Sequence, residues 1–216
     1  MADNFSINGV NIQWLGHASF KIKAGDKDVY IDPYVLKDAE KADLVLVTHD
    51  HYDHCDAGKI EKISKEDTII ITTKHCADKL SGCKASTETM EQNEEKTIDG
   101  IKIKTIPSYN IGKDFHPKGR GIGFIIEIDG KKIYHAGDTD KIPEMNSLAA
   151  VGIDVALLPV GGTYTMDARE AAEAAKIIKP KIAVPMHWGM IVGSKKDAEA
   201  FAELLKGTGI IVKILD

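Results

Sequence analysis

The chain has 216 residues, of which 43% are hydrophobic and 28% are charged, a composition typical of a folded globular protein with its own core. Its formal net charge of −5 disfavours a non-specific nucleic-acid binder, which needs a strong basic footprint. No apolar run approaches the ~20 residues that span a bilayer, and the start shows no signal-peptide pattern, so we expect a cytoplasmic protein without a membrane anchor.

The first third of the chain predicts short strands and two helices. Apolar or alternating segments bounded by turn residues are typical of strands, and the continuous apolar run Leu44–Val47 is typical of a strand buried on both faces. The predicted strands are 10–15, 18–23, 28–32, 44–47 and 68–72, and the predicted helices are 56–64 and 75–80.

The rest of the chain begins with hairpins and continues with strands that alternate with helices. Asp99-Gly100 and Asp129-Gly130 are strong hairpin signals. Asp167 and Glu170 predict a capping box at a helix start, and Pro180 marks the helix end. The predicted strands are 88–106 with its hairpin, 121–128, 132–135, 154–160, 182–185 and 210–214, and the predicted helices are 167–178 and 195–206.

The order of these elements predicts the fold class. Two strand-rich blocks, each followed by helices, predict an α/β protein with two packed sheets and helices outside them. A doubly wound parallel sheet is the alternative, and the hairpin signals argue against it. Because no linker, repeat or low-complexity tract is visible, we expect residues 1–216 to form a single domain.

Four metal-ligand side chains fall within six residues: His49, His51, Asp53 and His54. Imidazole and carboxylate are the natural ligands of Zn²⁺ and similar ions. Alternate residues at a strand end share a face, so His49 and His51 can point the same way. Four ligands this close in sequence suit a pair of ions better than one. The alternative interpretation is a polar surface loop that is rich in histidine and binds no metal.

This cluster resembles the His-x-His-x-Asp-His motif of the metallo-β-lactamase superfamily. Further segments resemble the same superfamily, and two of them resemble the branch that includes ascorbate-6-phosphate lactonase. The superfamily segments are Ala136-Gly137-Asp138-Thr139 and Pro185-Met186-His187-Trp188. The two that resemble the narrower branch are Trp14-Leu15-Gly16-His17-Ala18 and Leu158-Pro159-Val160-Gly161-Gly162. The resemblance implies a four-layer αββα sandwich, in which two mixed β-sheets are flanked by helices.

The resemblance also implies a ligand set for two ions, with Zn²⁺ expected and Mn²⁺ or Fe²⁺ as alternatives. His49 and His51 would bind the first metal, Asp53, His54 and His187 would bind the second, and Asp138 would bridge them. One departure is visible: Asn110 stands where the superfamily often has a third histidine for the first metal. Either the first metal has fewer ligands or His116, on the same segment, substitutes.

The implied activity is metal-dependent hydrolysis, in which a metal-bound hydroxide attacks a lactone, an ester or a phosphoester. The predicted catalytic residues are Asp53 and Asp138, which could orient the nucleophile or accept its proton, together with His17 and His116 at the substrate or leaving group. The expected partner is a small molecule, with an anionic sugar lactone as one specific suggestion. A nucleic-acid partner is not expected, and self-association into a homo-oligomer is left open.

Three alternatives compete with this hypothesis. A nuclease or phosphodiesterase of the same superfamily is disfavoured by the acidic balance and by the lack of room for a clamping domain. A diiron oxidoreductase would carry a carboxylate where His51 stands. A metal-binding module without turnover is kept open by Asn110.

Other polar residues are interpreted more simply. His135 is expected to orient a ligand or to be a buried core residue, and His75 to lie on a surface. Lys118 and Arg120 could bind an anion such as phosphate or carboxylate, although a solvated loop charge is the default for an isolated lysine or arginine. The three cysteines form no Cys-x-x-Cys pair, and Cys55 is interpreted as a packed thiol rather than a ligand.

Overall fold

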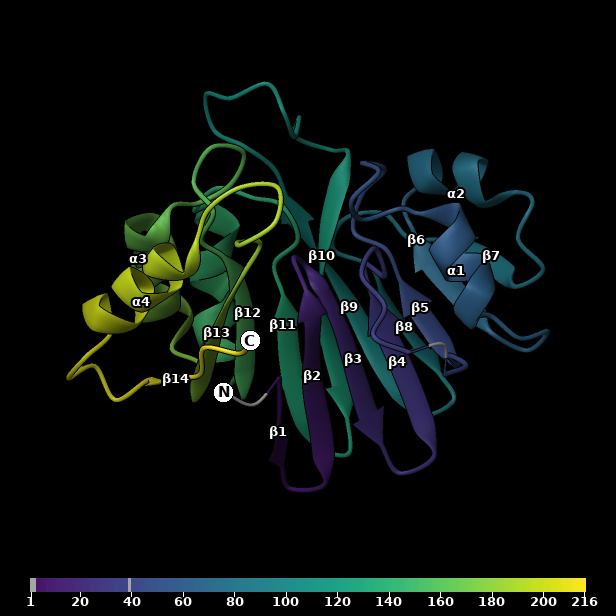
Figure 1. The fold of residues 1–216 in the computed structure, drawn as a ribbon, viewed down its shortest axis with the longest axis horizontal. Helices are drawn as coiled ribbons and strands as arrows, with labels where there is room; N and C mark the ends of the chain where they lie inside the picture. Colours follow the sequence, from purple (N-terminus) through teal and green to yellow (C-terminus); the bar gives the residue numbers. More distant parts are fainter. Residues whose placement is uncertain (1–2, 39) are drawn as a thin grey trace. The chain divides into compact units, whose positions relative to one another are not determined.

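The structure, a computed structural model, describes residues 3–38 and 40–216. The chain divides into two compact units, and each contains one sheet with its own helices (Figure 1). The N-terminal unit comprises residues 1–91 together with Asp216, and the C-terminal unit comprises residues 92–215. Within the described residues, every helix is too short or too polar to cross a membrane.

The sheet of the N-terminal unit has seven strands in the order of the chain. Its first four strands pair antiparallel, and the fourth to the seventh pair parallel. The strands are β1 (Asn4–Ile7), β2 (Val10–Gly16), β3 (Ser19–Ala24), β4 (Lys27–Ile31), β5 (Leu44–Leu46), β6 (Ile69–Thr72) and β7 (Ser86–Thr89). With this pairing, β2, β4, β5 and β6 run the same way, so their carboxyl ends share one edge.

Two helices pack on one face of this sheet through a buried apolar cluster. Helix α1 (Ala57–Ile63) contributes Ile60 and Ile63, and helix α2 (Lys74–Leu80) contributes Cys76 and Leu80. The sheet contributes alternate residues, among them Tyr30, Val45 and Ile70. Burying such side chains stabilises the unit by about 1.5–3 kcal/mol per large apolar residue. The Asp56 carboxylate caps α1 by accepting from the Lys59 backbone N–H.

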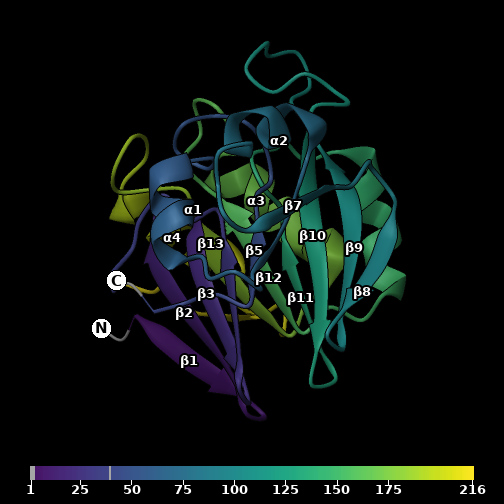
Figure 2. The same ribbon diagram turned by 90° about the vertical axis from the view of Figure 1, so that its right-hand side faces the viewer.

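The sheet of the C-terminal unit also has seven strands in the order of the chain, with antiparallel pairing first and parallel pairing after (Figure 2). The strands are β8 (Glu95–Ile98), β9 (Ile101–Ser108), β10 (Gly121–Ile128), β11 (Lys131–His135), β12 (Val155–Pro159), β13 (Ile182–Met186) and β14 (Ile211–Val212). The carboxyl ends of β9, β11, β12 and β13 therefore share one edge.

Three helices accompany this second sheet. Helix α3 (Ala168–Ile178) contacts β12, α4 (Lys195–Leu204) contacts β13, and the 3₁₀ helix η1 (Pro143–Ala150) packs against α3. Helix α3 is amphipathic and buries a row of alanines with Ile178. Its capping box is formed by Asp167 and Glu170, as predicted, and Lys179 ends it in the left-handed conformation.

Most predicted elements are confirmed, including both Asp-Gly hairpins and the α/β class with two mixed sheets. The doubly wound single sheet is excluded. The sequence patterns missed β1, whose burial pattern is only partial, and η1, which buries little beyond Met145 and Leu148 and has no long apolar period. They also assigned the start of the 88–106 segment to its hairpin, whereas β7 pairs with β6 in the other sheet. The last strand is shorter than predicted. The single domain over residues 1–216 stays a prediction.

Candidate metal centre

Asp32 organises the histidine-rich loop of the N-terminal unit. It follows β4 and is fully buried, and its carboxylate accepts from the Thr48 backbone N–H at 2.8 Å and from the Thr48 hydroxyl at 2.8 Å. The same carboxylate lies 2.7 Å from His54 Nδ1. One buried anion therefore fixes both ends of the loop that follows β5, because buried polar groups are held by hydrogen bonds.

This network also sets the ring nitrogen that each histidine presents. His54 Nδ1 donates to the Asp32 carboxylate, so its Nε2 carries the lone pair. The Thr48 hydroxyl donates its one proton to Asp32, so His49 Nδ1, 3.0 Å away, must be the donor to that oxygen. Both imidazoles therefore carry the lone pair of a metal ligand on Nε2.

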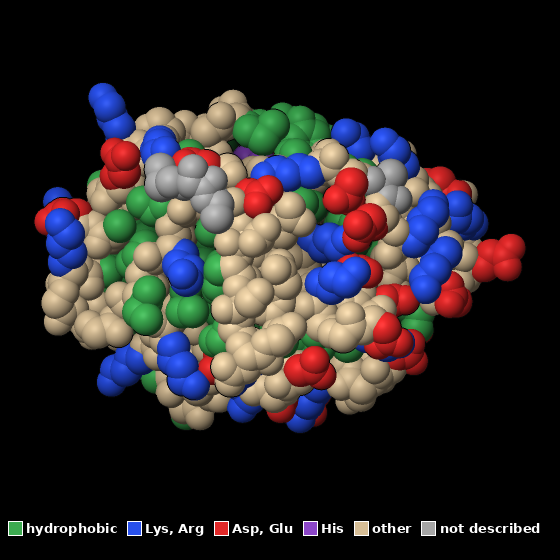
Figure 3. Space-filling model, turned by 60° about the horizontal axis from the view of Figure 1, so that its bottom comes forward, with side chains coloured by type: hydrophobic (Ala, Val, Ile, Leu, Met, Phe, Trp, Pro, Cys, Tyr) green, Lys and Arg blue, Asp and Glu red, His purple; other side chains and the backbone are tan. Residues whose placement is uncertain are grey.

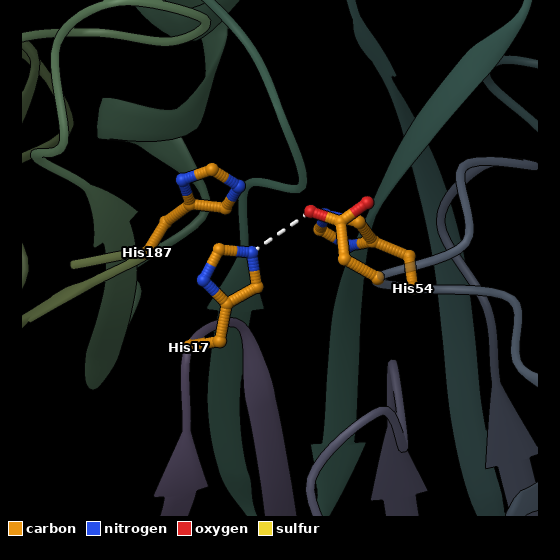
Figure 4. Close-up of side chains that lie close together, drawn as sticks. His17, His54 and His187 are labelled. Atoms are coloured by element: carbon orange, nitrogen blue, oxygen red, sulfur yellow. Dashed lines mark hydrogen bonds and ion pairs between the residues drawn. The ribbon is translucent and has the colours of Figure 1, made fainter. Parts of the chain in front are cut away.

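His17 holds the carboxylate of Asp53. It sits in the turn between β2 and β3, is fully buried, and its Nε2 lies 2.9 Å from Asp53 Oδ2, the contact dashed in Figure 4. His54 Nε2 lies 3.6 Å from the same oxygen. The ligand atoms of His17, Asp53 and His54 are all within 4.8 Å of one another, and so are those of His49 and His51. His51 alone among these side chains is exposed.

In the C-terminal unit, Asp138 lies between two histidines from different strands. Asp138 follows β11, His116 lies in the 109–120 loop after β9, and His187 directly follows β13. Asp138 Oδ2 is 3.3 Å from His116 Nε2 and 3.0 Å from His187 Nε2, and all three side chains are buried. A carboxylate flanked by two imidazoles can serve one ion on each side.

Asn110 turns His116 toward that carboxylate. Its Nδ2 donates to Asp140 Oδ1 at 3.0 Å and to the Tyr164 carbonyl at 2.9 Å, which identifies Oδ1 as the remaining acceptor. Oδ1 then accepts from the His116 backbone N–H at 3.0 Å and from His116 Nδ1 at 2.9 Å. His116 consequently carries its lone pair on Nε2, the nitrogen that faces Asp138.

Close backbone packing places His187. A Cβ on Gly161, just after β12, would stand 2.3 Å from the His187 carbonyl oxygen and 2.8 Å from Val192 Cγ1. Only glycine allows this approach of the loop to the end of β13. Gly161 therefore permits a close contact between this loop and the protein backbone at His187.

Three residues of these networks adopt the left-handed backbone conformation that favours glycine. They are His17 at φ 54°, Asp32 at φ 45° and His187 at φ 58°. Such positions cost free energy and are typical of functional sites, where the surrounding structure enforces them. All three follow strands, at the edges where the candidate ligands gather.

These side chains fit metal ions. Two ligands on one tetrahedral Zn²⁺, with bonds of about 2.1 Å, stand about 3.4 Å apart. The distances of 3.0 and 3.3 Å around Asp138 and of 3.6 Å between Asp53 and His54 lie near that value. Each of three imidazoles is also held on Nδ1 by an oxygen, as metal-ligating histidines usually are.

The sequence reasoning missed Asp32, Asn110 as an orienting group, and Asp140. Asp140 accepts from the Ile111 backbone N–H at 2.8 Å and from Lys113 Nζ at 2.8 Å. The signal for Asp32 was an acidic residue before Pro33 at the end of an apolar strand. It could have been read as a strand-end carboxylate.

The remaining predicted candidates have structural partners. His135 is fully buried, and its Nδ1 accepts from the Gly137 backbone N–H at 3.2 Å, which shapes the turn before Asp138. His75 is exposed on α2, as predicted. Cys55 is buried in the apolar cluster, and its hydrogen bond with Cys76, together with burial, raises the pKa of the Cys55 thiol, which fits a packed thiol.

Comparison with known proteins identifies the class of this chain. Residues 11–187 match the family model described as a beta-lactamase superfamily domain. A UPF0173 metal-dependent hydrolase of Pyrococcus abyssi is 38% identical over 212 residues, which is 91% of this chain and 92% of that protein. One from Thermoplasma acidophilum is 39% identical over 221 residues, 96% of each chain. A crystal structure from Parabacteroides distasonis, described as a metal-dependent hydrolase, aligns with a TM-score of 0.87 and 33% identity over 100% of this chain and 98% of that one.

The protein is therefore a metal-dependent hydrolase of the metallo-β-lactamase superfamily, and its two mixed seven-stranded sheets and the five helices among its described residues match that fold. This confirms the superfamily, the fold class and the enzymatic activity that the motif predicted. Within the superfamily, the chain belongs to the UPF0173 metal-dependent hydrolase family.

Proposed function

We propose that this hydrolase cleaves a lactone, an ester or a phosphoester of a small molecule with the help of two metal ions. His49, His51 and His116 would hold the first ion, Asp53, His54 and His187 the second, and Asp138 would bridge. Zn²⁺ is the expected metal because imidazole and carboxylate are its usual ligands, with Mn²⁺ or Fe²⁺ as alternatives. The lactone follows from the resemblance to the ascorbate-6-phosphate lactonase branch.

The position of Asp138 carries this proposal. A bridging carboxylate needs a ligand of each ion beside it, and Asp138 has His116 on one side and His187 on the other at 3.3 and 3.0 Å. Ser108 holds the segment in place, because its hydroxyl donates to the Asp138 carbonyl at 2.8 Å. This arrangement supports the proposal that His116 takes the role of the histidine that Asn110 replaces in the sequence.

The chain's own residues supply orientation and proton transfer. When bound, ions in such a site supply Lewis acidity and lower the pKa of water to about 7. Asp53 and Asp138 are the carboxylates that can accept a proton or orient the nucleophile. His17 acts as a positioning residue, since it is fully buried and its Nε2 contacts Asp53. His116, whose Nδ1 lies against Asn110 Oδ1, acts as a ligand of the first ion rather than on the substrate.

Surface charge favours a small-molecule substrate over a nucleic acid. On the face in Figure 3, lysines and arginines are interspersed with aspartates and glutamates. The total of 28 basic against 33 acidic residues fits this mixture. A nuclease needs a continuous basic path for the phosphate backbone. We infer a cytoplasmic enzyme of small metabolites.

The test replaces Asp138 with Asn, which preserves volume and removes the charge. Removal of groups that merely orient a ligand typically costs 10–100-fold, so loss of a bridging ligand should lower hydrolysis by more than about a hundredfold. Metal content, measured by elemental analysis, should fall as well. The substrates are a panel of lactones, carboxylic esters and phosphodiesters, assayed with Zn²⁺, Mn²⁺ and Fe²⁺ in turn.

Asp154→Asn is the matched control. Asp154 is another buried carboxylate of the same unit, but its partners are Lys181 Nζ at 2.7 Å and the Lys132 backbone N–H at 2.9 Å. This variant should keep its metal and its activity. Full metal content and full activity in Asp138→Asn would refute the bridging role.

A further inference from the structure

Most of the exposed large hydrophobic side chains lie close in sequence to the candidate ligands. Among the residues that the structure describes, seven large hydrophobic side chains are exposed, and five of these lie within five residues of a candidate ligand in the sequence. They are Tyr52 beside His51 and Asp53, Ile111 and Phe115 before His116, and Met190 and Ile191 after His187. Clustering of such residues on functional loops marks a binding surface, whereas scattered ones need no explanation.

In the C-terminal unit these residues sit on two loops that a third loop connects. Phe115 packs edge-on against Tyr164, with ring centroids 4.8 Å apart. The Tyr164 carbonyl accepts from Asn110, so the 109–120 loop is anchored to the loop after β12. That loop in turn contacts the segment after β13, where a Cβ on Gly161 would touch His187 and Val192. Ile111, Phe115 and Met190 therefore lie on one connected group of loops that also carries His116 and His187.

The lysines of the 109–120 loop are committed to acidic partners. Lys113 Nζ donates to Asp140 Oδ1 at 2.8 Å and to the Thr165 carbonyl at 3.0 Å. Lys118 Nζ donates to Glu144 Oε1 at 2.9 Å and lies over the Tyr109 ring at 4.6 Å. These charges are balanced within the protein, so they give little attraction for an anionic substrate. Besides the charged residues Asp114, Lys118 and Arg120 and the glycines, the loop exposes Ile111, Phe115 and Pro117 to solvent.

We propose that Ile111, Phe115 and Met190 bind an uncharged, apolar acyl or alkyl group of the substrate. The inference rests on the proposed metal centre and narrows it, since it favours hydrophobic esters or lactones over the anionic sugar lactone. Bringing such a group against half-exposed apolar side chains removes hydrocarbon surface from water. The gain is about fourfold in affinity for each methylene that is fully buried and less for one in partial contact.

The experiment measures binding of alkyl hydroxamates to the zinc-loaded protein by calorimetry. The hydroxamate group chelates the metal, and the alkyl chain probes the neighbouring surface without any need for turnover. From acetohydroxamate to octanohydroxamate, the dissociation constant should fall at least about tenfold, well within the limit set by full burial of six methylenes. A hydroxamate of intermediate length that ends in a carboxylate should bind more weakly than its uncharged counterpart.

The variants Phe115→Ser and Met190→Ser should reduce the ratio of the acetohydroxamate to the octanohydroxamate dissociation constant severalfold. The dissociation constant of acetohydroxamate itself should stay unchanged. Leu204→Ser and Ile211→Ser are the matched controls, because Leu204 and Ile211 are 41% and 58% exposed, similar to Phe115 at 48% and Met190 at 56%, but lie on α4 and β14. All four side chains are partly exposed, so the variants should fold.

Three other results of these experiments would contradict the apolar site. If hydroxamates bind with no dependence on chain length, or if the carboxylate-ended compound binds more tightly, the apolar site is refuted while the metal centre stands. If no hydroxamate binds the zinc-loaded protein, the metal centre fails and the inference fails with it. If the wild type is a dimer that Phe115→Ser or Met190→Ser dissociates in light scattering, the surface is a contact between copies of this chain.

Discussion

The two units share a strand pattern but gather their candidate ligands in different ways. In each sheet, an antiparallel meander leads into parallel strands, and polar residues follow the strands whose carboxyl ends share an edge. The N-terminal unit concentrates its ligands in one loop, His49–His54, after β5. The C-terminal unit draws Asp138, His116 and His187 from three loops that follow three strands.

This difference determines what holds each set in place. In the N-terminal unit, one buried carboxylate, Asp32, fixes the loop through Thr48 and His54. In the C-terminal unit, the ligands lie on three segments that are far apart in the chain. There the loops are fixed by contacts between them, such as Asn110 with Asp140 and Tyr164, and Gly161 with His187. The positions of the N-terminal ligands should therefore depend mainly on one residue, and those of the C-terminal ligands on several.

Among the substitutions that test this difference, the largest loss of stability and zinc affinity is expected at Asp32. Asp32→Ala would leave the donors of Thr48 and His54 without their acceptor in a fully buried position. We expect a loss of about 3 kcal/mol in unfolding free energy, because several buried donors lose a charged partner. Zinc affinity should fall 10–100-fold, as for other groups that orient a metal ligand. Denaturant unfolding and competition with a chelator measure the two effects.

The control for Asp32 lies in the same unit. Asp43 accepts from Lys65 Nζ at 2.7 Å and from the Asp28 backbone N–H at 2.8 Å, away from the histidine loop. Asp43→Ala should cost about 1 kcal/mol and leave zinc affinity unchanged. If Asp32→Ala does not fold, Asp32→Asn offers a milder loss, and unchanged zinc affinity in that variant would contradict the single-residue anchor.

The same contrast explains what the sequence could predict. His49, His51, Asp53 and His54 were recognisable because the pattern is local, and strand periodicity placed them at a strand end. The left-handed turn residues Asp99 and Asp129 were also recognisable, since each precedes a glycine in a hairpin. His17, Asp32 and His187 adopt the same conformation without a local signal, because tertiary contacts impose it.

The ligands of the C-terminal unit were only partly predictable. Asp138 and His187 were found by resemblance, and their meeting depends on strand order and register, which single-sequence patterns do not determine. Asn110 was noticed as a departure from the superfamily motif. Its use as an acceptor for His116 depends on Asp140 and Tyr164, which are 30 and 54 residues away in the chain.

A second, smaller effect is expected at Gly161. Gly161→Ala would place a methyl group 2.3 Å from the His187 carbonyl and 2.8 Å from Val192 Cγ1, so one of the two loops must move. We expect a stability loss of about 2 kcal/mol from overpacking and a tenfold or larger fall in affinity for the ion at His187. Gly82→Ala is the control, because a Cβ there meets nothing within 4 Å. Equal zinc affinity in the two variants would mean that the close approach at Gly161 does not position His187.

The smallest effect is expected at Asn110. Asn110→Ala removes the acceptor of His116 Nδ1, but the backbone hydrogen bond from Asn110 N–H to the His116 carbonyl, at 2.8 Å, still closes the loop. The ring of His116 should therefore lose its fixed orientation while the loop keeps its course. We expect about a tenfold fall in affinity for one of two ions, seen as a separate step in chelator titration, and a stability loss of about 1.5 kcal/mol from the lost side-chain hydrogen bonds. Asn146→Ala, at an exposed asparagine whose side chain bonds only the Pro143 carbonyl among the contacts described, should change neither. If both ions instead titrate as in the wild type, His116 is positioned by packing alone, and the C-terminal ligand set is more robust than its dispersed origin implies.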